Sequence, residues 1–285
     1  MLALRIKADI DKYCVDTYDG GHRNHLGGSQ IGEECKRKLW YIFRWCKHEV
    51  TTGRQQRLFN RGHREEARFI EWLEGIGCKV WYEDRSKPQN ADGTYPQYRI
   101  SGVMGHLGGS LDAIVQLPER YGIDEIVLGE FKTNGTGHGF NKLNSDGMAV
   151  AKPMHFAQTS IYGKEYRFRY VLYLNICKND DDIHIEIVKL DEALGDQMKL
   201  KAERIIMSQV PPPRLSENPT FQGCKYCHFS EICHVGATPE VNCRSCVNAV
   251  PVENAEWFCN VHNGIIPKDF IRKACPSYKA VTQNV

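Results

Sequence analysis

Apolar side chains recur along this chain at two different spacings. Over residues 61–77 they return at three- and four-residue steps, which predicts an amphipathic helix that ends at Gly75 and Gly77. The same spacing predicts helices over 33–47, 154–162 and 191–209. Short apolar runs predict strands at Lys79–Tyr82, Tyr98–Val103, Gly109–Leu117, Ile123–Lys132, Arg169–Ile176 and Ile183–Val188. Because helices and strands are interspersed along the chain, we expect an α/β fold.

A change of character follows the proline run Pro211–Pro213, which breaks the chain. Beyond it, seven cysteines fall within 52 residues and apolar runs are few, so we expect a small module held by metal rather than by a core. The resulting division is a large domain over residues 1–235, closed by a four-cysteine cluster, and a zinc-ribbon-like module over residues 236–285.

The composition says more about the cellular compartment of the protein than about its function. The 285 residues carry a net charge of +2, so charge alone does not indicate nucleic acid. No apolar run approaches the roughly 20 residues of a membrane span, and the N-terminus lacks the apolar stretch of a signal peptide, which favours the cytoplasm. Twelve cysteines are many for that compartment, where metal binding is a commoner use of cysteine than disulfide formation.

A carboxylate and a lysine stand two positions apart in the run Glu130-Phe131-Lys132. Side chains alternate between the faces of a strand, so Glu130 and Lys132 point the same way while Phe131 points into the core. The carboxylate can hold a divalent metal, and the lysine can orient a water or offset charge on a phosphate. Alone, this pattern is more often a solvated strand face.

A second acid, Asp112, lies in an apolar run that is preceded by glycines. Two antiparallel strands joined by a turn near Pro118–Gly122 would bring it beside Glu130. Glu66 falls on the helix of residues 61–77, with His63 as a rival three positions before it. Gln158 and Tyr162 are four residues apart on a later helix and share one face, so both can reach one site.

In their order along the chain, these residues resemble the RecB-like branch of the PD-(D/E)XK nuclease superfamily. The resemblance covers roughly residues 29–235 and rests on Gly62…Glu66, Gly109…Asp112, Glu130…Lys132 and Gln158…Tyr162. It implies a restriction-endonuclease-like core, a central mixed sheet flanked by helices. It also implies that Asp112 and Glu130 bind Mg²⁺ or Mn²⁺ with support from Glu66, that Lys132 positions the water attacking a DNA phosphodiester, and that Gln158 and Tyr162 contact substrate or steady the site. The family often has histidine at the helix position.

The first cysteine group is Cys224, Cys227 and Cys233, whose close spacing is typical of thiolates that share one metal. Cys35 is the best fourth partner. The same nuclease branch includes CRISPR-associated and AddB-type members with one cysteine before the core and three after it, which implies a [4Fe–4S] cluster. Zinc on the same four cysteines is the alternative, because both accept four thiolates. The basic run Lys36–Lys38 beside Cys35 could face DNA phosphates.

The second cysteine group predicts a zinc ribbon or knuckle, since a Cys-x-x-Cys pair at Cys243 and Cys246 is followed by Cys259. Either His262 or Cys275 completes it, and we favour Cys275. Such modules bind DNA, bind protein or stabilise a chain end. Basic residues around this group favour nucleic acid as the partner of the module. They are Lys268, Arg272, Lys273 and Lys279. The remaining cysteines, which show no ligand pattern, are Cys14, Cys46, Cys78 and Cys177.

The sequence thus favours a metal-dependent deoxyribonuclease, an exonuclease acting on DNA ends or single strands, and the resemblance fits a phage-encoded enzyme in a host cytoplasm. A non-catalytic DNA- or protein-binding module with the zinc module as its working end is the alternative, and an iron–sulfur redox protein is a third reading. A protein partner in a recombination or repair complex fits as well. Polarity, strand preference, endonuclease activity, pathway and oligomeric state stay open.

Overall fold

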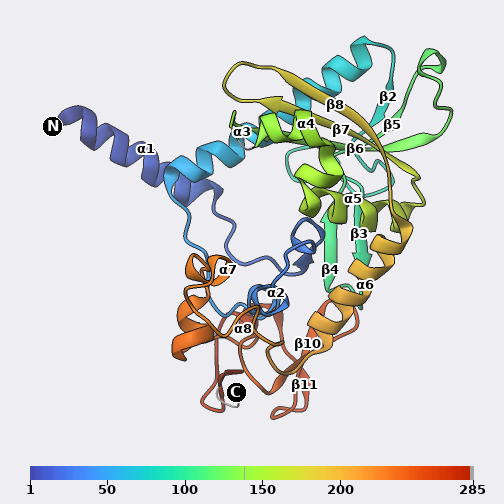
Figure 1. Cartoon of the computed structure of the whole chain (residues 1–285). Coiled ribbons are helices and arrows are strands. Elements are labelled where there is room, and N and C mark those ends of the chain that lie inside the picture. Colours follow the sequence, from blue (N-terminus) through green and yellow to red (C-terminus); the bar gives the residue numbers. More distant parts are fainter. Residues whose placement is uncertain (138, 283–285) are drawn as a thin grey trace. The chain divides into compact units, whose positions relative to one another are not determined.

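The computed structural model describes residues 1–137 and 139–282 and divides into two compact units (Figure 1). Unit 1 consists of Met1–Asp19, Thr51–Ile100 and Gly109–Asp196. Unit 2 consists of Gly20–Val50, Ser101–Gly108 and Gln197–Val285. These units differ from the two domains that the sequence predicts, which meet between residues 235 and 236. That domain boundary stays a prediction.

Unit 1 is built on a five-stranded mixed sheet. Its strands, in spatial order, are β2 (Lys79–Trp81), β5 (Ala113–Gln116), β6 (Ile126–Asn134), β7 (Tyr170–Cys177) and β8 (Ile183–Lys189). Strands β6 and β7 pair in parallel, and the other neighbours pair antiparallel. The short helix η2 (Glu119–Tyr121) and Gly122, whose φ is +71°, make the turn between β5 and β6.

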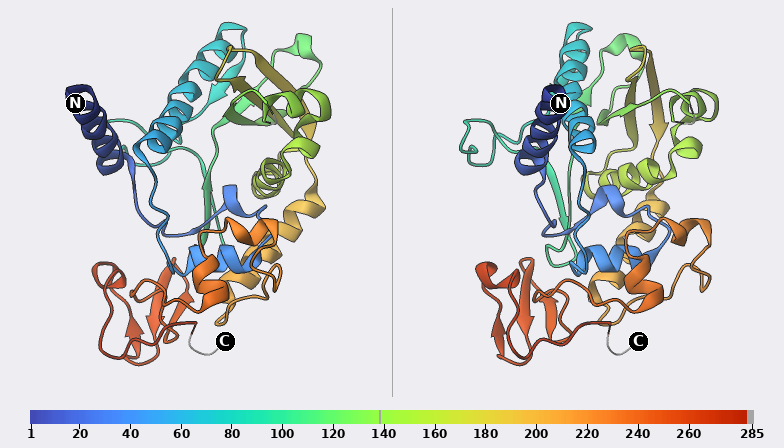
Figure 2. Two further views of the ribbon diagram at one scale, coloured as in Figure 1. Left: turned by 60° about the vertical axis from the view of Figure 1, so that its left-hand side comes forward. Right: turned by 90° about the vertical axis from the view of Figure 1, so that its left-hand side faces the viewer.

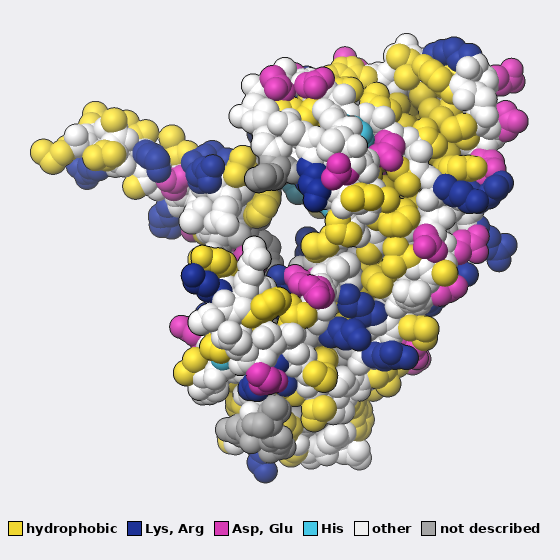
Figure 3. Space-filling view, in the orientation of Figure 1, with side chains coloured by type: hydrophobic (Ala, Val, Ile, Leu, Met, Phe, Trp, Pro, Cys, Tyr) yellow, Lys and Arg dark blue, Asp and Glu magenta, His cyan; other side chains and the backbone are white. Residues whose placement is uncertain are grey.

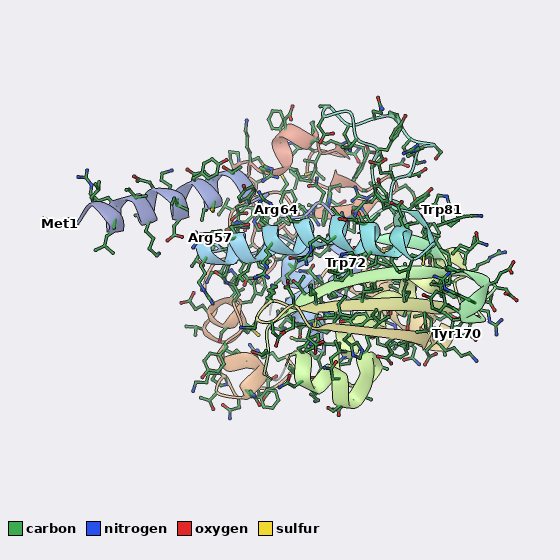
Figure 4. The ribbon with its side chains drawn as sticks, turned by 90° about the horizontal axis from the view of Figure 1, so that it is seen from above. Met1, Arg57, Arg64, Trp72, Trp81 and Tyr170 are labelled. Carbon is green, nitrogen blue, oxygen red and sulfur yellow. The ribbon has the colours of Figure 1, made fainter. Side chains whose placement is uncertain are left out.

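Helix α3 (Gly53–Gly75) covers one face of this sheet (Figure 4). It begins at a capping box in which the Thr52 side chain accepts from the Gln55 backbone N–H and the Gln55 side chain accepts from the Thr52 backbone N–H. Phe69 packs on Phe131 of β6 with their ring centroids 5.2 Å apart. Because side chains alternate along β6, the burial of Phe131 under α3 turns Glu130 and Lys132 to the opposite face.

Helices α4 (Phe140–Ala151) and α5 (Pro153–Tyr166) lie on that opposite face (Figure 4). They form the crossover that two parallel neighbouring strands require. Pro153 fits the first turn of α5, where its missing N–H costs no intrahelical hydrogen bond. The crossover therefore places α5 over β6 and β7, on the same side as Glu130 and Lys132.

Helix α1 (Leu2–Tyr18) packs on α3 within unit 1. The backbone of Asp11 lies so close to Gly53 that a Cβ there would overlap it, and the Asp11 carboxylate pairs with Arg57. Apart from this contact, α1 exposes most of its apolar side chains, as Figure 3 shows along the projecting helix. The crossing is thus fixed by a glycine and one ion pair rather than by a large apolar interface.

Unit 2 has an aromatic core. It includes Trp40 of α2 (Lys36–Phe43), Trp45 just after that helix, and Trp257, which comes from much further along the chain. Its antiparallel sheet is formed by β9 (Ala249–Val252), β10 (Glu256–Cys259) and β11 (Gly264–Ile265) (Figure 2). The other elements of unit 2 are β1 (Leu26–Gly27), η1 (Gly28–Gln30), α7 (Gln222–Lys225), η3 (Glu231–Val235) and α8 (Lys268–Ile271). Elements with residues in both units are β3 (Arg99–Gly102), β4 (Leu107–Ser110) and α6 (Glu192–Met207).

The predicted α/β class and a central mixed sheet flanked by helices are confirmed. The single strand predicted over Gly109–Leu117 is wrong, because the chain leaves one sheet after Ser110 and enters another at Ala113. Helix α3 begins eight residues earlier than predicted, at its capping box. In the described part of the chain, no helix is long and apolar enough to cross a membrane.

Candidate active site

The break between β4 and β5 places Asp112 against β6. Strands β5 and β6 pair with Ala113 opposite Gly129, so one step further along this antiparallel register Asp112 stands opposite Glu130. The Asp112 Oδ2 atom accepts a hydrogen bond of 2.8 Å from the backbone N–H of Phe131. The predicted approach of the two acids through antiparallel strands is therefore present in the fold.

Lys132 lies between these two carboxylates. Its Nζ atom forms an ion pair with Glu130 and lies 3.6 Å from Asp112 Oδ2. The Glu130 side chain is fully buried, and its Oε2 atom has no hydrogen-bond donor among the described residues. Buried carboxylate oxygens that lack donors are costly unless a cation satisfies them. Two converging carboxylates supply the oxygen ligands that a hard divalent metal such as Mg²⁺ or Mn²⁺ prefers.

Burial controls the protonation of this cluster. It raises the pKa of Glu130 to about 7, with the positive charge of Lys132 opposing the shift and Asp112 adding to it. Burial also raises the pKa of Asp112. For Lys132, burial lowers the pKa, but the two carboxylates outweigh it and hold the pKa above its ordinary value. Glu130 in the metal-free cluster therefore takes up a proton more readily than an exposed glutamate.

These shifts predict a pH-dependent stability of the metal-free protein. The pKa of Glu130 is higher in the fold than in the unfolded chain, so its contribution is present below about pH 4.5 and is lost as the pH rises towards about 7. Burial lowers the pKa of His106 to about 4 and of His155 to about 3, which acts in the opposite direction. We therefore expect the melting temperature of Glu130→Gln minus that of the native chain to rise by several degrees between pH 5 and pH 8 in EDTA. A difference that stays constant with pH would contradict this electrostatic account.

Glu66, on α3, belongs to the same cluster. Its negative charge contributes to the raised pKa values of both Asp112 and Glu130. It is hydrogen-bonded to His63 Nδ1 at 3.2 Å and to Gln97 Nε2 at 3.4 Å. The His63 side chain is 77% exposed, whereas that of Glu66 is 28% exposed. The geometry therefore places the carboxylate, rather than the imidazole, on the side of the two strand acids.

Gln158 and Tyr162 lie on α5 and are both buried. The Tyr162 hydroxyl approaches the backbone at Gly109 so closely that a Cβ there would overlap it. Gly109 is therefore required by packing, since any side chain would displace the tyrosine. Two parts of the sequence pattern, the glycine before Asp112 and the tyrosine after Gln158, thus meet in space.

We expect Gly109→Ala to destabilise unit 1 by about 1–3 kcal/mol, because the added methyl group overlaps the Tyr162 ring and hydroxyl. Tyr162→Phe combined with Gly109→Ala should recover part of that loss, since it removes the nearest atom. Urea unfolding of the two single variants and the double variant measures the coupling. Strictly additive losses would show that the two residues do not meet as described.

Three polar residues near Lys132 were not predicted from the sequence; they are His155, Tyr173 and Asn175. His155 Nδ1 is 2.8 Å from the Tyr173 hydroxyl, and Asn175 Nδ2 donates to the same hydroxyl at 3.2 Å. Tyr173 and Asn175 stand opposite Glu130 and Lys132 in the parallel register of β6 and β7. The signal was present, because His155 precedes Gln158 and Tyr162 by three and seven residues on one helix face.

The cysteines of the first group converge within unit 2. Cys35, Cys224, Cys227 and Cys233 line one cavity of about 20 Å³. The Arg37 guanidinium lies 4.0 Å from Cys233 Sγ, and the backbone N–H of Lys38 donates to Cys35 Sγ. Burial raises the pKa of the Cys224 and Cys227 thiols, and the charge of Lys38 opposes that shift at Cys227. The donor chemistry of this cavity fits both a cluster and zinc.

The second cysteine group surrounds a separate cavity of about 600 Å³ in unit 2, with His262 also on its lining. Among residues 1–137 and 139–282, no three His, Cys, Asp or Glu side chains are close enough together to form a ready metal site. The cysteines of each group therefore line one cavity, but in the described structure they are not close enough together to coordinate a metal. The four cysteines without a ligand pattern are all buried.

No protein-family model and no curated protein matches the chain. Solved structures with a partial likeness include SSO0001, with a TM-score of 0.45, 18% identity and coverage of 82% of this chain and 98% of that chain. They also include LHK-Exo in complex with dAMP (TM-score 0.44, 13% identity, 64% and 86% covered) and the alkaline exonuclease LHK-Exo from Laribacter hongkongensis (0.42, 13%, 68% and 90%). At these values the likeness assigns neither fold nor function to the chain.

Proposed function

We propose that this chain is a divalent-metal-dependent deoxyribonuclease that hydrolyses phosphodiester bonds at the cluster of Asp112, Glu130 and Lys132. The observation that carries the proposal is the pairing in register of the fully buried Glu130 carboxylate with the Asp112 carboxylate, which is 16% exposed, with one ammonium between them. Among the described residues, one oxygen of Glu130 is left without a donor. Such a group is costly to bury and is expected where charge is used in chemistry.

Each side chain has a role that follows from its position. Asp112 and Glu130 would hold the ion, and Glu66 adds a third negative charge to that side of the site. A divalent ion bound there would activate water and stabilise charge on the phosphate. Lys132 places a fixed positive charge beside both acids, where it orients the attacking water. Gln158 and Tyr162 fix the α5 side of the site.

The choice of DNA as substrate is supported by the sequence resemblance and by a basic face on α3. Its arginines recur every three or four residues, and Figure 4 labels two of them. Four are exposed and one is half-buried; they are Arg54, Arg57, Arg61, Arg64 and Arg68. In the described structure, neither Arg54 nor Arg64 takes part in an ion pair. A row of this kind favours a phosphate backbone. The preference for DNA ends rests on the resemblance alone.

For the first cysteine group we propose a [4Fe–4S] cluster on Cys35, Cys224, Cys227 and Cys233, with zinc on the same residues as the alternative. The cavity they share and the cations beside it support a thiolate-bound group. Anaerobic purification followed by iron analysis and absorption spectroscopy separates the two. A colourless protein that contains zinc but no iron would remove the cluster.

The proposed activity is tested on end-labelled single- and double-stranded DNA with Mn²⁺, Mg²⁺, Ca²⁺ or EDTA. We expect degradation with Mn²⁺ or Mg²⁺ and none in EDTA, because a metal is needed to offset phosphate charge. Early release of labelled mononucleotides would indicate attack at ends, whereas internal fragments would indicate an endonuclease. Tight DNA binding without cleavage under any divalent metal would instead favour a non-catalytic binding module.

A further inference from the structure

Beside the acid cluster of unit 1, His155, Tyr173 and Asn175 form a chain of hydrogen bonds. Asn175 Nδ2 donates to the Tyr173 hydroxyl at 3.2 Å, and that hydroxyl lies 2.8 Å from His155 Nδ1. Tyr173 and Asn175 are fully buried on β7, where they stand opposite Glu130 and Lys132 in the parallel register with β6. His155 comes from α5, the helix that covers this face, so the chain of hydrogen bonds ends beside the proposed catalytic centre.

The direction of these hydrogen bonds fixes the position of the proton on the His155 ring. Burial raises the pKa of Tyr173 to about 12, so its hydroxyl keeps its proton at neutral pH. Asn175 is a donor to the hydroxyl oxygen, and His155 Nδ1 is the one acceptor that the described structure places within hydrogen-bond distance of the hydroxyl. Tyr173 therefore donates to Nδ1. A neutral imidazole that accepts at Nδ1 carries its proton on Nε2.

The Nε2–H group of His155 is a donor that the protein leaves unused. His155 is partly exposed, and among the described residues Nε2 has no hydrogen-bond partner. It is also not one of their buried atoms without a partner, so it is open to solvent. The ring stays neutral, because burial lowers the pKa of His155 to about 3 and the charges of Lys132 and Lys152 add to that effect. An N–H group that is held in one orientation and open to solvent suits an acceptor outside the protein.

The charges around His155 indicate that this acceptor is an anion. Lys132 and Lys152 both lower its pKa, which places two ammonium groups near the ring. Lys132 is paired with the strand acids. Lys152 meets no carboxylate in the described structure, and its Nζ atom lies 3.4 Å from Asn134 Oδ1. A neutral donor next to an unbalanced ammonium fits a phosphate group, which accepts hydrogen bonds from both.

We propose that His155 and Lys152 bind a phosphate of the DNA strand, next to the phosphate that is cleaved. Tyr173 and Asn175 hold the His155 ring so that Nε2–H donates to that group. This inference rests on the proposed nuclease activity, which brings a DNA backbone to the acid cluster. A contact to a phosphate that does not react is equally strong before and during the reaction, so it contributes to affinity rather than to kcat. His155 is thus a substrate-binding residue, and Tyr173 is a positioning residue.

The donor role is tested by two amide variants of His155. A glutamine amide nitrogen reaches about as far as Nε2, whereas an asparagine amide nitrogen reaches only about as far as Nδ1. We expect His155→Asn to weaken binding of labelled single-stranded DNA about tenfold in Ca²⁺, measured by fluorescence anisotropy, and His155→Gln to stay within about threefold of native. In Mn²⁺, KM should follow the same order, with kcat of both variants within about threefold of native. Native affinity in His155→Asn, or equal losses in both variants, would overturn the donor role.

Phosphate as the acceptor is tested on the native chain with DNA that carries one neutral methylphosphonate linkage, placed at successive positions. We expect one position at which this linkage weakens binding by the native chain about tenfold but weakens binding by His155→Asn about threefold or less, because the contact from His155 is already lost. Equal losses for the two proteins at every position would overturn the proposal.

The part played by Lys152 is tested with Lys152→Met. We expect DNA affinity to fall about three- to tenfold and the slope of its salt dependence to become shallower by about 0.7, the value for one contact to a single strand. Lys164→Met is the matched control on the same helix, because Lys164 is already paired with Asp196 at 3.0 Å, and it should stay within about twofold of native. Unchanged affinity and salt slope in Lys152→Met would remove Lys152 from the phosphate site.

Failure of this inference is distinguishable from failure of the proposed activity. A native chain that binds DNA without cleaving it would refute the nuclease activity, and the affinity ratios of the His155 variants would still decide the phosphate site. A native chain that binds no DNA would refute both.

Discussion

Glu130→Gln should lower the rate of metal-dependent DNA cleavage by about 10³-fold or more. The amide keeps the size of the side chain but removes the negative charge that would hold the divalent ion. A loss of about 4 kcal/mol in transition-state stabilisation corresponds to this factor. The measurement is cleavage of end-labelled DNA under saturating Mn²⁺, together with Mn²⁺ titration by calorimetry, which should show weakened binding.

Glu125→Gln is the matched control for this variant. Glu125 precedes the same strand but is partly exposed and pairs with Arg169 on the surface, so the same substitution should leave cleavage within about twofold of native. Full activity in Glu130→Gln would show that the buried carboxylate cluster is not the catalytic centre. Equal losses in both variants would point to a general effect on the sheet.

Lys132→Met should separate catalysis from metal binding. Removing the ammonium is expected to reduce kcat by about 10²- to 10³-fold, the range for loss of one positioned charge at a reacting phosphate. Mn²⁺ binding should be retained or become tighter, because Lys132 no longer competes for the oxygens of Asp112 and Glu130. The metal-free variant should melt several degrees lower, since Asp112 and Glu130 lose the cation that pairs with both of them, and Mn²⁺ should restore the loss.

Lys189→Met serves as the control, because Lys189 is an exposed lysine at the end of β8 in the same sheet. It should change neither kcat nor the response of stability to Mn²⁺. Loss of Mn²⁺ binding in Lys132→Met would mean that the lysine organises the acids rather than competing with the ion. Retained cleavage would remove the lysine from the proposed mechanism.

The strand acids were predictable because the two-residue period of a strand fixes which side chains share a face. Phe131 had to be buried, so Glu130 and Lys132 had to face the other way, and antiparallel pairing then brought Asp112 to Glu130. The break of the chain at Asp112 was not predictable from that period. The run from Gly109 to Leu117 has apolar residues on both sides of Asp112, and only its tertiary pairing divides it between two sheets.

Helix α1 escaped prediction for a different reason. Its apolar side chains are mostly exposed, so its pattern does not mark one buried face. The contribution of His155 and Tyr173 was hidden because their pairing joins a helix and a strand that are distant in sequence. The burial of Arg44 and Arg244 in unit 2 was not predictable either, because burial of an arginine cannot be read from its neighbours along the chain.

Unit 2 is assembled from three segments that are far apart along the chain, with nearly all of unit 1 inserted between them. During synthesis on a ribosome, residues 20–50 emerge long before residues 197–285, which supply Trp257 and most of the cysteines. Trp40 and Trp45 must therefore wait for their packing partners while unit 1 is being made. Premature termination after unit 1 should consequently leave these aromatic side chains without their packing partners and the chain prone to aggregation.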